Sequence, residues 1–426
     1  MELRTGYKQT EVGAVPADWD VSPLGRLVTS VEYGSSAKSS TKGSMPVLRM
    51  GNLQGGKIDW NDLVYTDDER EIAKYALRPG DVLFNRTNTI DLVGKTSIYC
   101  GEEPAIFAGY LIRINAKKDL LDSCFLNYTL NTEFAKKYSL KVLSVAVGQA
   151  NINGQKLKTY PIPLPPTVGE QSAIAATLND VDALLSGLDK LIAKKRGLKQ
   201  AAMQRLLTGK TRLPGFKLKA GTKQTDAGVI PEDWDVSPVG REFDVKLGKM
   251  LDAEKNVGDL KPYLGNRSVQ WNQIDVSDLQ LMRMTRSDME RFRLRKGDLL
   301  VCEGGEVGRA ALWDEPIEEC YYQKALHRLR PLRGFDSRLM VEMLHLWSNA
   351  GTLDNYVTQT SIAHLPREKF LEVPMPVPPL SEQSAIAEVL SDMNSDLSLL
   401  EARRNKTRLL KQGMMQELLT GKTRLI

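Results

Sequence analysis

Residues 9–23 read QTEVGAVPADWDVSP, and residues 224–238 repeat them as QTDAGVIPEDWDVSP. Each half also closes on a shared segment, because LLTGKTRL at 206–213 returns at 418–425. The stretches between these shared segments barely resemble each other. An internal repeat sets the architecture of a chain, so it is interpreted before any other feature. We infer that the shared segments perform one task twice, and that the divergent stretches perform two different tasks of one kind.

The composition is that of a globular chain that is too long for one ordinary core. With 426 residues, 42% of them hydrophobic and 26% charged, the chain is expected to form two or more domains. No run approaches the ~20 apolar residues of a membrane span, and the first residues contain no apolar signal segment. We therefore expect a cytoplasmic protein with no membrane contact. The net charge of +5 permits an anionic partner such as nucleic acid.

Cysteine, histidine and the Gly-Lys-Thr segments give no support for a metal or catalytic centre. The four cysteines form no Cys-x-x-Cys pair, and all three histidines fall in the second half, which excludes a duplicated His-based site. GKT at 209–211 and 421–423 resembles the end of a phosphate-binding loop. That motif needs a glycine five residues earlier, where Gln204 and Gln416 stand. We find no catalytic constellation and expect a chain that is not an enzyme and binds no metal.

Each divergent stretch leads into a proline-rich exit and then a long helix. The exits, YPIPLPP at 160–166 and VPMPVPP at 373–379, are expected to be extended connectors because proline fixes φ and lacks an amide donor. Apolar residues then step by four and three, which is typical of a coiled-coil seam. The seam residues are Ile174, Leu178, Val181, Leu185, Leu188 and Ile192 in the first copy, and Ile386, Leu390, Met393, Leu397 and Leu400 in the second. We expect the two seams to pack as an intramolecular coiled coil, although an outside helix would fit the same seam.

The divergent stretches, 24–160 and 239–373, are predicted to be mixed β and α, so the chain is placed in the α+β class. Short apolar runs bounded by glycine and asparagine indicate strands, and helices are expected near 123–138 and 336–350.

A weak common frame persists between the two divergent stretches. LRPGDVL at 77–83 parallels LRKGDLL at 294–300, so the Gly-Asp turn into a buried strand is interpreted as scaffold. The residues that follow differ, with NRTN at 85–88 against EGGE at 303–306. A shared turn and strand followed by different polar residues is the pattern expected of two recognition domains.

The remaining candidates for function are polar and basic side chains on predicted turns. Arginine reads guanine, and asparagine or glutamine reads adenine, by paired hydrogen bonds in the major groove. Lysine and arginine also hold phosphates. Each of these residues alone is better interpreted as a solvated surface residue. Only their recurrence on the loops of two repeated domains favours DNA binding. The candidate DNA-binding residues are Lys38, Arg49, Asn52, Arg86, Asn88, Gln149 and Asn151 in the first stretch, and Asn266, Arg267, Gln270, Arg309 and Gln359 in the second.

Four segments together give the chain a family resemblance. They are the Pro-x-x-Trp motif (16–19 and 231–234), the Gly-Asp signature, the proline exit followed by Gln171 or Gln383, and the helix end LLTGK. In this order, twice, they resemble the DNA-specificity subunit of Type I restriction–modification enzymes over essentially the whole chain.

The resemblance implies two target-recognition domains separated by two long helices that pack antiparallel. Each domain would read one half of a bipartite, asymmetric DNA site with a gap of fixed length and free sequence. The subunit itself would bind no cofactor. It would bind double-stranded DNA and two modification subunits, which carry S-adenosylmethionine and methylate adenine, and the assembly would recruit restriction subunits that use ATP and magnesium.

The repeat divides the chain into four predicted segments. They are a first recognition domain (1–160), a first exit and spacer helix (161–213), a linker with the second recognition domain (214–373), and a second exit and spacer helix (374–426). The chain ends where a further copy of the opening motif would follow, so the repeat is circular with pseudo-twofold character. We therefore expect the two termini to lie close together.

Two rival functions stay open at this point. A coiled-coil scaffold that carries two ligand-binding domains would have no role on DNA, and its DNA binding would be absent or insensitive to salt. A self-sufficient DNA-cutting or DNA-modifying enzyme would turn over without partners when given magnesium, ATP and S-adenosylmethionine.

Overall fold

The computed structural model describes residues 5–146, 148–217, 220–252, 254, 256–359 and 363–425. The chain forms two compact units. Unit 1 comprises residues 1–189 and 402–426, and unit 2 comprises residues 190–401. None of the helices in the described part of the chain is long and apolar enough to cross a membrane.

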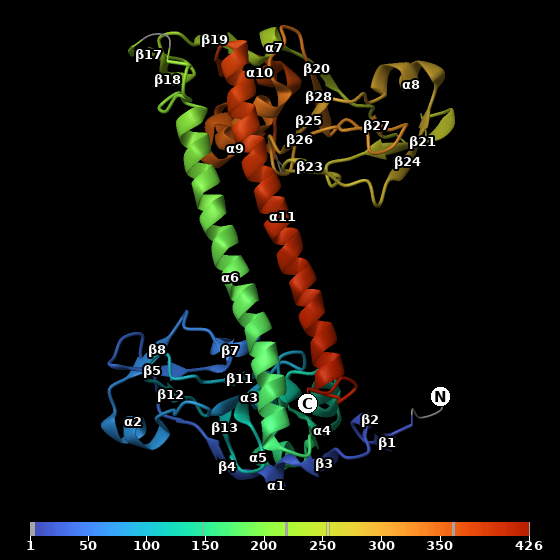
Figure 1. Cartoon of the computed structure of the whole chain (residues 1–426). Coiled ribbons are helices and arrows are strands. Elements are labelled where there is room, and N and C mark those ends of the chain that lie inside the picture. The colour runs from blue at the N-terminus through green and yellow to red at the C-terminus, as the bar shows by residue number, and fades with distance from the viewer. Residues whose placement is uncertain are drawn as a thin grey trace. The chain divides into compact units, whose positions relative to one another are not determined.

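Unit 1 is built on a mixed six-stranded sheet in the order β4-β13-β9-β11-β7-β6 and on a three-stranded sheet in the order β12-β5-β8 (Figure 1). The strands of these sheets are β4 Val28–Tyr33, β5 Met45–Leu48, β6 Leu53–Gln54, β7 Gly56–Ile58, β8 Val64–Thr66, β9 Val82–Asn85, β11 Thr96–Ile98, β12 Ile106–Phe107 and β13 Leu111–Ala116. Strand β9 is buried at every residue, as a strand covered on both faces must be.

The helices of unit 1 pack beside these sheets. They are α1 Leu24–Leu27, the 3-10 helix η1 Met50–Asn52, α2 Glu69–Tyr75, α3 Ser123–Leu130, α4 Glu133–Val142 and α5 Gly154–Lys158. The single helix that was predicted near 123–138 is therefore two helices. The break comes at Asn131, because the Thr132 hydroxyl accepts a hydrogen bond from the amide of Ala135 and caps a new helix.

Unit 2 has the same plan with fewer strands. Its main sheet has the order β20-β28-β25-β26, and a second sheet has the order β24-β21-β27. The strands are β20 Phe243–Leu247, β21 Asp259–Leu264, β22 Val269–Gln270, β23 Gln273–Ile274, β24 Gln280–Met284, β25 Leu299–Cys302, β26 Ala310–Leu312, β27 Tyr321–Tyr322 and β28 Leu326–Pro331. The helices are α7 Val239–Glu242, α8 Arg286–Phe292, α9 Ser337–Ala350, the 3-10 helix η2 Thr352–Tyr356 and α10 Arg367–Glu372.

The repeated opening motif and the proline exit form β structure in both units. A hairpin comes first, β1 (Tyr7–Thr10) with β2 (Gly13–Pro16), and β17 (Thr222–Thr225) with β18 (Gly228–Pro231). The exits are not free connectors as expected. Strand β16 (Pro161–Leu164) pairs with β3 (Asp20–Pro23), and β31 (Pro374–Val377) pairs with β19 (Asp235–Pro238). Both pairs are isolated two-stranded sheets, where every strand is an edge and the missing proline amides are tolerated.

The two long helices are α6 (Val168–Leu206) and α11 (Leu380–Leu418), and they run antiparallel in both units. In unit 1, Lys411 Nζ lies 2.7 Å from Asp182 Oδ1. In unit 2, Lys195 Nζ lies 2.9 Å from Asp396 Oδ2. The residue number rises along one helix as it falls along the other. The predicted mixed recognition domains and antiparallel coiled coil are therefore confirmed.

Each core is closed by the start of one long helix and the end of the other. The buried residues that do so are Ile174, Leu178, Leu418 and Leu419 around Trp19 in unit 1, and Ile386, Leu390, Met203, Leu206 and Leu207 around Trp234 in unit 2. The units therefore divide each helix, whereas the predicted segments 161–213 and 374–426 kept the helices whole. The boundaries of those four segments stay a prediction.

The repeated TGKTRL segment ends the long helix and starts an ion-pair cluster. Gly209 and Gly421 take φ values of +67° and +69°, as expected for the residue that follows a helix. A Cβ on either would come within 2.5 Å of a proline ring, Pro231 or Pro16. The helix-end interpretation of this segment is therefore confirmed, and glycine is required there.

In unit 2 the cluster is centred on Arg212. Its guanidinium lies 2.6 Å from Glu382 Oε2 and 2.8 Å from Asp233 Oδ1, and it covers the ring of Trp234 at 5.4 Å. The Trp234 indole N–H donates to the same Glu382 carboxylate at 2.9 Å. The cluster ties the end of α6 to the start of α11 and to the opening motif.

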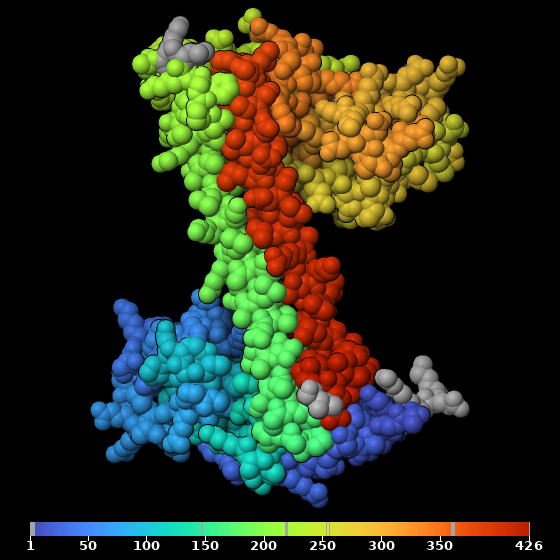
Figure 2. Space-filling view, viewed as in Figure 1, coloured from blue at the N-terminus to red at the C-terminus, as the bar shows by residue number. Residues whose placement is uncertain are grey.

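Arg424 is the counterpart of Arg212 in unit 1. Its Nη2 lies 2.9 Å from Glu170 Oε2, and its Nη1 lies 3.0 Å from Asp18 Oδ1. The Tyr7 hydroxyl also donates to the carbonyl of Gly421 at 3.2 Å. Figure 2 shows the end of α11, in red, against the blue N-terminal strands. The C-terminal segment therefore contacts the N-terminal motif, which confirms the circular repeat.

Candidate nucleic-acid interface

In unit 1 a small sheet gathers four of the predicted DNA-binding residues. Arg86 follows β9, and the next strand, β10 (Thr87–Asn88), pairs with β15 (Gln149–Asn151), which in turn pairs with β14 (Ser144–Ala146). Asn88, Gln149 and Asn151 therefore lie on adjacent strands next to Arg86. The Asn151 amide donates to the Thr87 hydroxyl at 2.6 Å, whereas Gln149 is exposed.

The main chain of Arg86 is fixed on both sides. Its amide donates to the Tyr110 carbonyl at 3.1 Å, and its carbonyl accepts from the Ile152 amide at 2.8 Å. The guanidinium lies over the ring of Tyr33, 4.7 Å from the centroid, and Nη1 donates to the Gly109 carbonyl at 3.3 Å. Arg86 forms no ion pair among the described residues. Its Nε is buried without a hydrogen-bond partner, so Nη1 and Nη2 are the nitrogens that remain to donate to a ligand.

Two exposed aromatic side chains flank Arg86. Tyr33 is 44% exposed and Tyr110 is 55% exposed. Neither residue was predicted, because their spacing in the sequence gives no sign that they meet. The Tyr33 ring lies under the guanidinium, whereas Tyr110 adjoins Arg86 through its main-chain carbonyl. The cation and the exposed aromatic surface make this edge of the unit suited to a planar, electron-rich ligand.

The other predicted residues of unit 1 do not join this cluster. Lys38 is exposed in the loop between β4 and β5. Arg49 pairs with Asp62 at 3.2 Å. Asn52 is 3% exposed, and its side chain holds the η1 turn by accepting from the Arg49 amide and donating to two carbonyls, those of Asp59 and Asn61. The Asn52 amide is thus bonded within the unit rather than presented at the surface, and its role on DNA stays a prediction.

Unit 2 presents the same main-chain frame with other side chains. The Glu303 amide donates to the Ala325 carbonyl at 2.9 Å, and the Glu303 carbonyl accepts from the Leu365 amide at 2.7 Å. Gly304 forms a bridge with His364 of β30 (Ala363–His364), which pairs with β29 (Thr358–Gln359). Glu303 therefore occupies the place of Arg86, and the β29–β30 hairpin that of β14–β15.

Glu303 and His364 were missed as candidates. The comparison of NRTN with EGGE sets Glu303 opposite Asn85 and is one residue out of register, because the Gly-Asp turns align Glu303 with Arg86. The correct register was the signal that would have found Glu303. Burial raises the pKa of Glu303, while the nearby His364 and Lys324 act in the opposite direction.

Three predicted residues of unit 2 lie beside this frame. Asn266 donates to the Gly304 carbonyl at 2.6 Å, and Arg309 donates to the Asn266 carbonyl at 2.8 Å. Arg309 also pairs with Glu306 at 3.1 Å, so its charge is largely used within the unit. The exposed Arg267 follows Asn266, and the two help to line a cavity of about 540 Å³.

The last two predicted residues of unit 2 are Gln270 and Gln359. Gln270 is exposed, and its amide donates to the Arg267 carbonyl at 2.9 Å. Gln359 belongs to β29, but its side chain lies outside the described residues. The role of all these residues on DNA stays a prediction.

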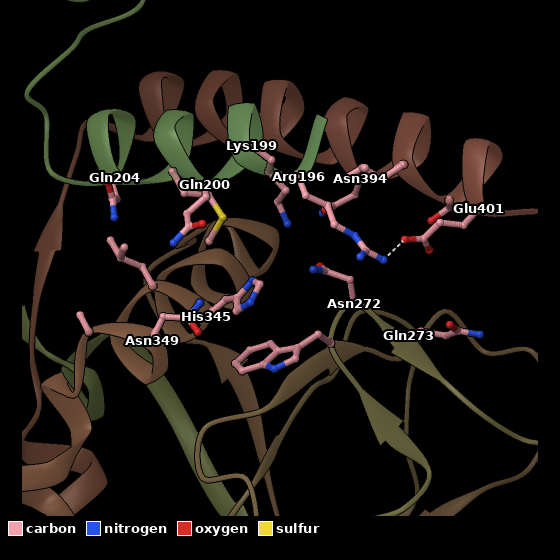
Figure 3. A pocket seen from close by; sticks show the side chains of 16 residues that line it. Arg196, Lys199, Gln200, Gln204, Asn272, Gln273, His345, Asn349, Asn394 and Glu401 are labelled. Carbon is pink, nitrogen blue, oxygen red and sulfur yellow. Dashed lines mark hydrogen bonds and ion pairs between the residues drawn. The ribbon is translucent and has the colours of Figure 1, made fainter. Parts of the chain in front are cut away.

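A second kind of site is a cavity against the end of a long helix, and it occurs in both units. In unit 2 it has a volume of about 520 Å³ and is lined by Gln200, Met203 and Gln204 of α6. Figure 3 shows Gln200 and Gln204 on the side of α6 that faces the cavity, with His345 among the residues across from them. His345 stacks on Trp271 with 4.4 Å between ring centroids. Burial lowers the pKa of His345, and the charge of Lys199 lowers it further.

In unit 1 a cavity of about 540 Å³ occupies the corresponding place. It is lined by Gln412, Met415 and Gln416 of α11, which stand six, three and two residues before LLTGKTRL, as do Gln200, Met203 and Gln204. The two cavities thus share these three helix positions, whereas the rest of their lining differs.

The comparisons with known proteins agree on one family. Residues 16–195 and 231–408 match the family of the Type I restriction modification DNA specificity domain, so the two matches cover both halves of the repeat. A putative type I restriction enzyme MjaX specificity subunit from Methanocaldococcus jannaschii is 28% identical over 437 residues, which cover 98% of this chain and 96% of the relative.

Two solved structures share the fold. The type I restriction–modification S subunit from M. genitalium has a TM-score of 0.62 at 16% identity, with 98% of each chain covered. A chain from a study of complex assembly and conformational transition in a type I system has a TM-score of 0.54 at 16% identity, covering 96% of this chain and 99% of that one. The repeated ion-pair cluster, the paired helices and the family match lead to one conclusion: this chain belongs to the DNA-specificity subunits of type I restriction–modification systems, which are the non-catalytic DNA-recognition subunits of those systems.

Proposed function

We propose that the chain reads a bipartite, asymmetric site on double-stranded DNA, with one half-site read by each unit. In unit 1 the reading edge is the Arg86 cluster on β10 and β15. In unit 2 it is the corresponding edge around Glu303 and the β29–β30 hairpin. A gap of fixed length and free sequence separates the half-sites, because paired helices rather than a flexible linker join the two units.

The observation that carries this proposal is a contrast within each unit. The ion-pair cluster that closes the unit is repeated, whereas the side chains at the candidate DNA-binding edge differ. Both units are closed by the same ion-pair cluster, around Arg424 and around Arg212. Their edges share main-chain hydrogen bonds at Arg86 and Glu303 but carry different side chains. Two domains of one kind would recognise two different base sequences in this way, with the same main-chain hydrogen bonds in both and different side chains at the surface.

The repeated cavities support two copies of one partner. Because Gln200, Met203 and Gln204 recur as Gln412, Met415 and Gln416, each unit offers the same three side chains to a ligand. We assign these positions to two modification subunits. S-adenosylmethionine would be bound by those subunits, which methylate adenine, whereas ATP and magnesium would serve the restriction subunits that join the assembly.

Coexpression with the modification subunit tests the proposal directly. The methylated adenines of the host genome are mapped with and without this chain. We expect methylation at one bipartite, asymmetric motif whose gap has a single length. A contiguous motif, or methylation that does not depend on this chain, would contradict the proposal.

Salt dependence separates DNA reading from the scaffold alternative. Binding of the purified assembly to a duplex that carries the motif should weaken as salt rises, because the bound protein displaces counterions from phosphates. If binding were absent or unchanged between low and high salt, a protein scaffold would be the better description. Incubation of the chain alone with DNA, magnesium, ATP and S-adenosylmethionine should give no turnover.

A further inference from the structure

We propose that residues 86 and 303 are one base-reading position used with opposite chemistry, so that Arg86 selects guanine and Glu303 selects cytosine. The inference rests on the proposed reading of DNA by the two units. It goes further by naming the base that one side chain in each unit requires.

The hydrogen bonds of the main chain show that the two positions correspond. In each unit the residue after the buried strand donates its amide to a carbonyl, that of Tyr110 or Ala325. Its own carbonyl accepts from an amide that follows the edge strand, that of Ile152 or Leu365. The side chains of Arg86 and Glu303 therefore leave the frame at the same point.

The surroundings of Arg86 suit a cation that donates. The guanidinium lies over the Tyr33 ring, and in unit 2 the place of Tyr33 is taken by Leu247, as the pairs Tyr33–Ile112 and Leu247–His327 show. The unit with an arginine at this position therefore has an aromatic ring beneath it, and the unit with a glutamate does not. Guanine offers two acceptors, O6 and N7, on its major-groove edge, which matches the two-pronged donor of an arginine.

Glu303 has the opposite requirement. Its carboxylate forms no hydrogen bond or ion pair among the described residues, so it needs a donor from outside. The major-groove edge of cytosine offers an amino group with no acceptor beside it. Guanine and thymine offer acceptors that repel a carboxylate, and adenine places N7 next to its amino group. Glu303 therefore favours cytosine by attraction and rejects the other bases by repulsion.

The residues next to Glu303 allow a base to come close. Thr87 and Asn88 follow Arg86, but Gly304 and Gly305 follow Glu303. A glutamate side chain is shorter than that of arginine, so the base edge must approach the main chain more closely. Two glycines remove the side chains that would prevent this. A Cβ on Gly304 would also lie 2.9 Å from His364 Nδ1 and 3.3 Å from the Ala363 carbonyl, so a larger residue here would require His364 to move.

Selection from a randomised duplex library tests the assignment. The assembly of this chain with its modification subunit is used, as wild type and as the variants E303Q, E303R and R86Q. For the wild type we expect a guanine in one half-site and a cytosine at the corresponding place in the other. E303Q should lower the preference for cytosine by about tenfold or more, at that base pair alone. E303R should replace the preference for cytosine at that position by a preference for guanine.

The controls separate the inference from the function on which it rests. E290Q makes the same change on the exposed surface of α8 and should leave both half-sites unchanged. R86Q should alter only the preference for guanine in the half-site that unit 1 reads. If the wild type selects a bipartite motif that E303Q does not change, the assignment of Glu303 is overturned while the proposed function stands. If the wild type selects no motif, the proposed function fails. E303Q has nearly the shape of the native side chain, so it serves even if E303R does not fold.

Discussion

The two arginines of the repeated TGKTRL segment hold clusters of the same residue types at different depths. The Arg212 side chain is 9% exposed and faces Glu382 at 0%. The Arg424 side chain is 25% exposed, and its partners Glu170 and Asp18 are 9% and 53% exposed, against 0% and 5% for Glu382 and Asp233. Removing one member of a buried pair leaves an unpaired charge away from water, whereas water replaces the partner of an exposed charge.

We therefore expect R212A to be more harmful than R424A. R212A should lower the stability of unit 2 by about 3–5 kcal/mol, and R424A should lower that of unit 1 by about 1–2 kcal/mol. Hydrogen exchange at residues 224–238 and 9–23 reports the two units separately. R286A breaks an exposed pair with Glu290 and should change little. Equal losses in R212A and R424A would contradict the role given to burial.

A buried histidine makes the stability of unit 2 depend on pH. His327 is 0% exposed, and its Nε2 lies 2.9 Å from the Leu365 carbonyl. Burial lowers its pKa from 6.5 to about 4; the hydrogen bond to Leu365 and the charge of Glu368 oppose this shift, and the charge of Arg367 adds to it. Between these values the unfolded chain binds a proton that the folded unit does not.

Stability from His327 is therefore complete above pH 6.5 and is lost as the pH falls towards 4, by about 3 kcal/mol in all. H327Q removes the titration and keeps a donor for Leu365. The fall in melting temperature of the wild type between pH 6.5 and 4 should be clearly smaller in H327Q. H364Q, at an exposed position, should behave as the wild type. An unchanged pH profile in H327Q would show that other groups cause it.

At the scale of elements, periodic patterns were predicted well and pairings were not. The steps of four and three found both long helices, because a seam repeats along one continuous segment. The strands β16 and β31 were missed because their prolines look like connectors, and only their partners β3 and β19 make them strands. The break at Asn131 escaped notice for a similar reason, since the apolar pattern continues across it.

The difficulty of predicting strand pairing also explains which candidate DNA-binding residues were found and which were missed. Arg86, Asn88, Gln149 and Asn151 were chosen by residue type, and the pairing of β10 with β15 does bring them together. Asn52 was chosen by the same rule and lies inside a turn. Residue type indicates what a side chain is able to bind, but the hydrogen-bond register decides whether it is presented. Glu303 was passed over because it was judged by its type alone.

The paired helices predict how the DNA site responds to their length. Inserting one heptad into both α6 and α11 adds about 10 Å of helix. The gap between half-sites should lengthen by about three base pairs, at ~3.4 Å per pair. Methylation mapping of the host genome measures the gap. An unchanged gap would contradict the idea that the helices set it.

Insertion into one helix alone is the matched control. It shifts the antiparallel register between the two ends, so that the pairs Lys195–Asp396 and Lys411–Asp182 can no longer both form. We expect this variant to lose site-specific methylation rather than to change the gap.

At the scale of the whole chain, the circular repeat predicts that a permuted chain will fold. Joining Ile426 directly to Met1 leaves seven residues between Leu425 and Tyr7, and the native junction has eight between Leu213 and Thr222. Opening the chain within 214–221 then gives a permutant whose cluster around Arg424 is preserved. It should methylate the same motif with the same gap as the wild type. A permutant that does not fold would count against the equivalence of the two junctions.

The closure of unit 1 by Leu418, Leu419 and Arg424 also bears on how the chain is made. A ribosome delivers residues in order, and domains commonly fold in that order, the N-terminal one first. Here all of unit 2 has emerged once Glu401 has done so, whereas unit 1 still needs residues 402–425, which are made later. The unit whose synthesis begins first is therefore completed second, and until Leu418 and Leu419 emerge its core is not closed.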